Sequence, residues 1–87
     1  MPSVIVSHRV NEFGAWKEKF DADKSRREAA GISDLVVGRK SEDPNLIYLV
    51  FGVDDLSVMH DFVADPATKA IMAEAGVISE PEAVFLD

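Results

Sequence analysis

The first hydrophobic pattern in the chain is an alternating stretch, residues 3–10 (SVIVSHRV), which is rich in β-branched side chains and predicts a β-strand. Apolar positions then recur every three to four residues, which predicts a helix over residues 12–30 with Asn11 as its N-cap. We expect Gly31 to end that helix in the left-handed conformation. Three aromatic rings at i, i+3 and i+7 share one face of it: Phe13, Trp16 and Phe20.

Two further strands are predicted on either side of a short turn. Residues 32–40 form the first strand, residues 41–45 the turn, and residues 46–53 (LIYLVFGV) the second strand, which is the most apolar stretch of the chain. A turn of this length predicts that the two strands form an antiparallel hairpin.

A second helical region follows in two pieces. Asp54 or Asp55 caps the first piece, which places four residues on one side: Leu56, Met59, His60 and Val63. Asp65 and Pro66 restart the helix as its N-cap and first helical residue. Gly76 is expected to end this piece as Gly31 ends the first helix. The side chains expected to point inward from the second piece are Ala67, Ala70 and Ile71.

The order of elements is therefore βαββαβ, completed by a strand over residues 77–86 that Pro81 interrupts. Residues 3–40 and 45–86 form two similar halves, because each has a helix that ends in Gly followed by a β-branched residue. This order is typical of the ferredoxin-like fold of the α+β class, with a four-stranded antiparallel sheet. We expect residues 1–87 to form one domain of this fold.

The strand over residues 46–53 is apolar on both of its faces, although two helices can cover only one face of a four-stranded sheet. A chain of 87 residues forms only a small hydrophobic core, and no Cys is present to stabilise it with a disulfide. Oligomerisation is the usual compensation in such a case. We therefore expect a homodimer in which the second sheet face packs against the same face of another copy.

The amino-acid composition argues against several classes of partner and of catalytic chemistry. The formal net charge is −7, which argues against nucleic acid and anionic membrane surfaces as partners. The absence of Cys excludes a disulfide scaffold and a thiolate nucleophile. The sequence shows neither the pattern of a signal peptide nor an apolar run long enough to span a membrane, so we expect a cytoplasmic protein.

Three segments resemble the dimeric α+β barrel superfamily, and most closely its antibiotic biosynthesis monooxygenase-like branch. They are the first strand (VSHRV, residues 6–10), the apolar strand over residues 46–53, and residues 55–66 (DLSVMHDFVADP) followed by Lys69. The resemblance implies a ferredoxin-like dimeric α+β barrel with a cavity between sheet and helices. Oxygenases of that branch often carry a Trp near the end of the third strand, whereas this chain has Phe51-Gly52-Val53.

Three residues are candidates for catalysis: His8, His60 and Tyr48. His8 lies mid-strand among valines, where it is either a core histidine or, on the face that the resemblance assigns to the cavity, a neutral general base. His60 matches the helix histidine of the resemblance. It is either a half-exposed helix residue or a residue that closes the pocket or serves as a second acid or base. Tyr48 either binds the carbonyl of a ligand or anchors the dimer face.

Three residues are candidates for ligand binding: Trp16, Arg27 and Val6. Trp16 is either a core residue or, together with Val6, part of an apolar wall that contacts the ligand. Arg27 falls on the face of Trp16, so either its head reaches out to solvent or it orients an anionic ligand. Two histidines without a third ligand at suitable spacing do not make a metal site, so we expect no metal and no cofactor.

Two hypotheses follow from these residues. In the first, the protein is a small cofactor-free enzyme for an aromatic or polyketide-like molecule, in which His8 abstracts a proton next to a carbonyl, leading to isomerisation, cyclisation or oxygenation. In the second, it is a homodimer without catalytic activity that binds a ligand or has a structural role. An open cavity of about 300 Å³ or more beside His8 would favour the first hypothesis.

Overall fold

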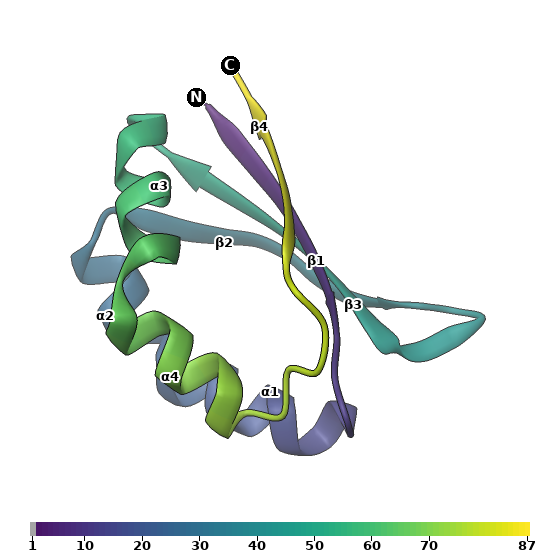
Figure 1. Ribbon diagram of the computed structural model, residues 1–87. Helices are drawn as coiled ribbons and strands as arrows, with labels where there is room; N and C mark the ends of the chain where they lie inside the picture. Colours follow the sequence, from purple (N-terminus) through teal and green to yellow (C-terminus); the bar gives the residue numbers. More distant parts are fainter. Residues whose placement is uncertain (1) are drawn as a thin grey trace.

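The computed structural model describes residues 2–87, which form a sheet covered on one face by helices (Figure 1). The sheet is antiparallel with strand order β2-β3-β1-β4, so the α+β ferredoxin-like architecture predicted from the sequence is confirmed. The elements in chain order are β1 (Ser3–Arg9), α1 (Phe13–Ala22), α2 (Lys24–Ala29), β2 (Ile32–Lys40), β3 (Asp43–Val53), α3 (Leu56–Ala64), α4 (Pro66–Glu74) and β4 (Glu82–Leu86).

The alternation of β1 decides which side chains face the helices. Its burial pattern alternates along the strand, and His8 pairs with Ile47 of β3 on the buried side. The inner face of the sheet supplies most of the core: Val4, Val6, Val10, Ile32, Ile47, Leu49, Phe51 and Val53. His8 therefore sits in the apolar layer between the sheet and the helices.

The first helix differs from its prediction in two respects. Glu12 rather than Asn11 is the N-cap, because its carboxylate accepts hydrogen bonds from the main-chain nitrogens of Gly14 and Ala15. The helix also breaks at Asp23, whose φ of −91° and ψ of 3° leave the helical region. The break separates α2 from α1 and sets the direction of the two arginines that follow.

The strand boundaries also differ. β3 begins at Asp43, so the turn to β2 is Ser41–Glu42 rather than residues 41–45, and the hairpin projects beyond the rest of the molecule (Figure 1). β4 is confined to Glu82–Leu86, while Val77 makes only an isolated bridge to Val10. Pro81, which lacks an N–H for a strand ladder, precedes the strand instead of interrupting it.

The second helical region has the predicted restart, since the Asp65 carboxylate caps α4 by accepting from the Ala67 nitrogen. The expected inward side chains are only partly correct. Ala67 and Ala70 are exposed, whereas Thr68 is buried at 6% exposure. The inner face of α4 was not recognised from the apolar pattern, because the buried residue on that face, Thr68, is polar.

Both helix-ending glycines have the predicted left-handed conformation, with φ of 85° at Gly31 and 86° at Gly76. Each Gly→Ala substitution is expected to lower the free energy of unfolding by about 1 kcal/mol, because Cβ disfavours positive φ. A Cβ at Gly31 would meet no atom within 4 Å, so its cost comes from the main chain alone. Urea denaturation of each variant measures the loss, and an unchanged or higher stability would contradict it.

The outer face of the sheet carries exposed apolar side chains. Val36, Tyr48, Val84 and Leu86 are 54%, 43%, 53% and 44% exposed. Val36 pairs with Val50, and Val84 pairs with Ile5, so this apolar surface continues across all the strands. No helix within residues 2–87 has the length and hydropathy needed to cross a bilayer.

Candidate functional site

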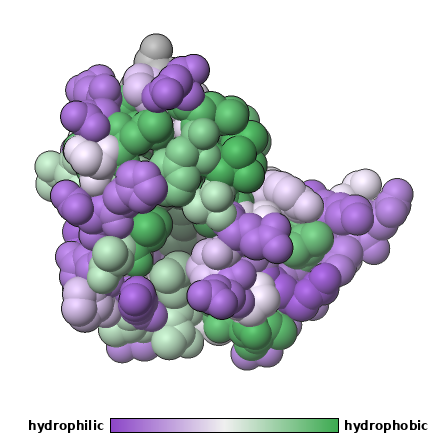
Figure 2. Space-filling view, turned by 45° about the horizontal axis from the view of Figure 1, so that its top comes forward, coloured by the Kyte–Doolittle hydropathy of each residue, from purple (hydrophilic) through white to green (hydrophobic). Residues whose placement is uncertain are grey.

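A cavity of about 480 Å³ lies between the inner face of the sheet and the helices. Figure 2 shows the molecule hollowed there, with hydrophobic side chains bordering the hollow. Its apolar lining comes from the sheet and the helices alike: Val6, Leu49, Phe51, Ala83, Trp16, Phe20, Met59, Phe62, Val63, Ile71, Met72, Ala75 and Pro81. Its polar lining is sparse and consists of His8, Asp23, Arg27, Thr68, Lys69 and Glu80. A mostly apolar cavity with few polar groups is typical of small-molecule sites.

His8 reaches this cavity from the middle of β1. The residue is 4% exposed, and its ring makes a T-shaped contact with the Trp16 ring at a centroid distance of 5.6 Å and an interplanar angle of 65°. Its Nδ1 atom is buried, and within residues 2–87 no contact of that nitrogen has hydrogen-bond geometry. A buried side-chain nitrogen usually has a hydrogen-bond partner, so the unpartnered Nδ1 of His8 is unusual.

Burial controls the protonation of His8. Loss of solvation disfavours the imidazolium and lowers the pKa of His8 from its ordinary value of 6.5. A weaker contact with its own main chain acts in the opposite direction. The ring is therefore neutral at pH 7 and can accept a proton from a molecule in the cavity.

The apolar wall predicted from Trp16 and Val6 lines the cavity. Trp16 is 3% exposed and stacks on Phe20 at a centroid distance of 4.9 Å, and Phe20 in turn lies 6.4 Å from Phe51. Val6 is 6% exposed on the same strand face as His8. These side chains offer a planar or aromatic molecule extended apolar contact beside the imidazole.

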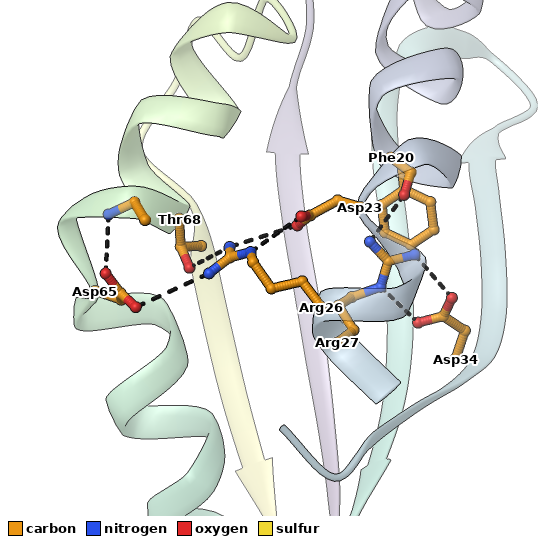
Figure 3. A network of polar contacts seen from close by, with 8 residues as sticks. Phe20, Asp23, Arg26, Arg27, Asp34, Asp65 and Thr68 are labelled. Carbon is orange, nitrogen blue, oxygen red and sulfur yellow. Dashed lines mark hydrogen bonds and ion pairs between the residues drawn. The ribbon is translucent and has the colours of Figure 1, made fainter. Parts of the chain in front are cut away.

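Arg27 lines the cavity, but its guanidinium neither reaches solvent nor lacks a partner. It is 4% exposed and makes two hydrogen bonds of 2.9 Å to the Asp34 carboxylate and one of 2.9 Å to the Phe20 carbonyl oxygen (Figure 3). Its Cζ also lies 3.6 Å from the centre of the Phe20 ring. The pair with Asp34 connects α2 to β2 and neutralises the charge of Arg27. We therefore assign Arg27 a structural role.

Arg26, the neighbouring residue, reaches across to α4. It donates a hydrogen bond of 2.7 Å to Oγ1 of Thr68, and its Nε lies 3.0 Å from the Asp23 carboxylate (Figure 3). Thr68 and Asp23 both line the cavity. The two helix pairs are thus joined by polar side chains at the cavity wall.

Tyr48 and His60 lie away from this cavity. Tyr48 pairs with Ser7 on the outer face of the sheet, because its position in β3 has the opposite parity to Ile47 and Leu49. His60 is exposed and stacks on Phe85 of β4, with centroids 4.0 Å apart and an interplanar angle of 6°. The structure brings His8, Trp16, Val6 and Arg27 together and leaves these two residues outside.

Sequence reasoning missed Asp34, Arg26 and Thr68. Asp34, like Ile32, lies on the inner face of β2. A carboxylate at that position, together with Arg27 on an apolar helix face, was a signal in the sequence for a buried ion pair. Arg26 carried no comparable signal, because its contact with Thr68 depends on the helix break at Asp23. Within the described residues, no group of three or more His, Asp or Glu side chains could hold a metal ion.

Comparisons with known proteins define the fold. No protein-family model and no curated protein matches the chain. A candidate antibiotic biosynthesis monooxygenase from Bordetella bronchiseptica matches with a TM-score of 0.81 at 15% identity, over 99% of this chain and 94% of that one. One from Caulobacter crescentus matches with a TM-score of 0.76 at 13% identity, over 99% and 87%.

An uncharacterised NIPSNAP domain protein from Burkholderia xenovorans has a TM-score of 0.71 at 14% identity, over 100% of this chain and 93% of that one. At such identities the likeness concerns the fold. The chain has the ferredoxin-like α+β fold of proteins named as antibiotic biosynthesis monooxygenases, as the sequence resemblance predicted.

Proposed function

We propose that the protein is a cofactor-free enzyme that binds a small, largely apolar aromatic ketone in the cavity, with His8 as the general base. The observation that carries the proposal is a buried imidazole in the wall of a mostly apolar cavity of about 480 Å³. The fold is shared with proteins named as antibiotic biosynthesis monooxygenases, which supports an enzymatic role on a small molecule.

The proposed step is a proton transfer. The imidazole of His8 takes a proton from the carbon next to the ketone, the C–H electron pair becomes the C=C bond of an enolate, and the carbonyl π pair moves to oxygen. Return of the proton to another carbon gives an isomer, and attack of the carbanion on a second carbonyl of the same molecule gives a ring. In an oxygenation, dissolved dioxygen would add to the enolate carbon to give, after protonation, a hydroperoxide, and loss of water would leave a second carbonyl group at that carbon.

The environment of His8 suits this step. The low pKa of His8 keeps it unprotonated at neutral pH, and Trp16 and Phe20 hold a planar substrate against it. The rest of the lining is mostly apolar, so few other side chains compete with His8 for the substrate proton.

Deuterium exchange into 2-tetralone in D₂O, followed by NMR, tests the proposal. General acid–base groups typically contribute about 10²–10⁴-fold to rate, so the protein is expected to accelerate exchange at C1 by at least about 100-fold over buffer. His8→Ala is expected to remove this acceleration. His60→Ala is the matched control, because His60 lies outside the cavity, and it is expected to leave the rate unchanged.

Equal exchange rates for the wild type and His8→Ala would overturn the catalytic role of His8. If 2-tetralone still perturbed the fluorescence of Trp16, the alternative of a ligand-binding homodimer without catalysis would stand instead.

We propose further that the protein is a homodimer through the outer face of the sheet. The support is the row of exposed apolar side chains on that face, among them Val36, Tyr48 and Val84. An apolar sheet face of this extent is usually covered by a partner, and a second copy covers it with one self-complementary contact.

Light scattering is expected to give a particle of twice the 9.5 kDa chain mass at micromolar concentration. Val84→Lys places a charge in the apolar face and is expected to shift the particle to the monomer mass. Ala70→Lys, which adds the same charge to an exposed site on α4, is the control and is expected to remain dimeric. A wild-type particle of 9.5 kDa would contradict the dimer.

A further inference from the structure

We propose that the Thr68 hydroxyl, backed by Arg26, is the hydrogen-bond donor for the carbonyl oxygen of the molecule in the cavity. The site would then select aromatic ketones over the corresponding hydrocarbons. This inference rests on the proposed function, because it assigns the second polar contact of the same ligand.

Thr68 is the hydroxyl-bearing residue that α4 turns toward the cavity. It is 6% exposed, and its neighbours in the lining include Met59, Ile71 and Met72. A hydroxyl in such surroundings loses its hydration, so its hydrogen-bonding capacity must be met by protein or ligand.

The protein contributes a donor to the hydroxyl oxygen but no acceptor for the hydroxyl hydrogen among residues 2–87. Oγ1 of Thr68 accepts the 2.7 Å hydrogen bond from Nη2 of Arg26. A hydroxyl can accept and donate at the same time. Because its acceptor side is bound to a cation, the O–H group is polarised and becomes a stronger donor.

Two carboxylates and one aromatic ring position Arg26 for its contact with Thr68. Its Nε and Nη2 lie 3.0 and 3.4 Å from the two Asp23 oxygens, and its Nη1 lies 3.9 Å from Asp65 (Figure 3). Its Cζ also lies 4.5 Å from the centre of the Phe62 ring. Arg26 is thus a positioning residue that would act through Thr68.

The two polar groups reach the cavity from opposite layers, His8 from the sheet and Thr68 from the helices. In the proposed complex, the ketone lies between the two layers with its acidic C–H toward the imidazole and its oxygen, two bonds from that carbon, toward the hydroxyl. When the proton leaves, negative charge develops on that oxygen, and a donor already aimed at it becomes more favourable. The pair therefore provides a base and an oxyanion donor for one reaction.

Fluorene and 9-fluorenone test the inference, since they differ only by the carbonyl group at C9. Binding of each is measured through the fluorescence of Trp16, the single Trp of the chain, for the wild type, Thr68→Val and Thr68→Ser. The ratio of the two dissociation constants is expected to favour 9-fluorenone about tenfold more in the wild type than in Thr68→Val, the size expected for one hydrogen bond. Thr68→Ser, which keeps the hydroxyl, is expected to retain the wild-type ratio.

The carbonyl stretch of bound 9-fluorenone gives a second measure. It is expected at lower frequency in the wild type and Thr68→Ser than in Thr68→Val, and fluorene binding reports whether each cavity is intact. Equal ratios and equal carbonyl frequencies in the wild type and Thr68→Val would overturn the role of Thr68 while leaving the proposed cavity function standing. Failure of both compounds to bind the wild type would overturn ligand binding itself.

Discussion

Asp34→Ala is expected to lower the free energy of unfolding by about 3–5 kcal/mol, because it leaves the guanidinium of Arg27 buried without its carboxylate. Arg27 is 4% exposed, and Asp34 receives two of its three hydrogen bonds. The Phe20 carbonyl and ring remain, but neither carries a compensating charge. Urea denaturation followed by circular dichroism, at fixed protein concentration, measures the loss.

Two further variants distinguish the destabilisation caused by an unpaired buried charge from that caused by the loss of a contact. Arg27→Met combined with Asp34→Ala removes both charges and is expected to recover much of the stability lost in Asp34→Ala alone. Asp21→Ala breaks the exposed Lys17–Asp21 pair and is expected to cost only about 0.3–0.5 kcal/mol. A loss at Asp34 no larger than the loss at Asp21 would contradict the buried pair.

Trp16→Ala is expected to cost about 3 kcal/mol, the lower end of the range for truncating a buried aromatic ring. The ring is 3% exposed and contacts Phe20, Phe13 and His8, so its removal eliminates much of the packing between α1 and the sheet. The lower end applies because one side of the ring already borders the cavity, where fewer atoms contact it.

Trp16→Phe is the control for this substitution. It keeps a ring stacked on Phe20 and is expected to lose less than half as much stability in the same denaturation measurement. A loss of under about 1 kcal/mol for Trp16→Ala would show that the ring contributes little packing, contrary to its position in the core.

Much of the fold was predictable because its determinants are local and periodic. The alternation of residues 3–10 and the glycines at 31 and 76 correctly predicted a strand and two left-handed helix ends. The break at Asp23 was not predicted, because residues 21–28 contain one apolar side chain, Ala22, and so carry no apolar periodicity in which an interruption could be seen. β3 starts at Asp43, earlier than predicted, because Asp43 pairs with Lys40. The residues around this pair are typical of turns, so the sequence did not indicate the pairing.

The candidate site was only partly predictable, for a physical reason. Strand parity placed His8 and Val6 on one face of the sheet, and helical spacing placed Trp16 and Arg27 on one face of the first helical region. These two faces pack toward each other, so all four residues line the same cavity. Tyr48 lies on the other face of the sheet, which the same parity already indicated. The contact of Thr68 with Arg26 joins residues 42 positions apart, and no local pattern reports such a pairing.

The central claim, a neutral imidazole open to a ligand cavity, is tested most directly by ¹⁵N NMR titration of His8. The chain has two histidines, so a His60→Gln background leaves the His8 ring as the single imidazole signal. We predict a titration midpoint below the ordinary value of 6.5, together with a change in the ring nitrogen shifts when 2-tetralone is added at pH 7. A midpoint at or above 6.5 with no response to 2-tetralone would contradict the claim.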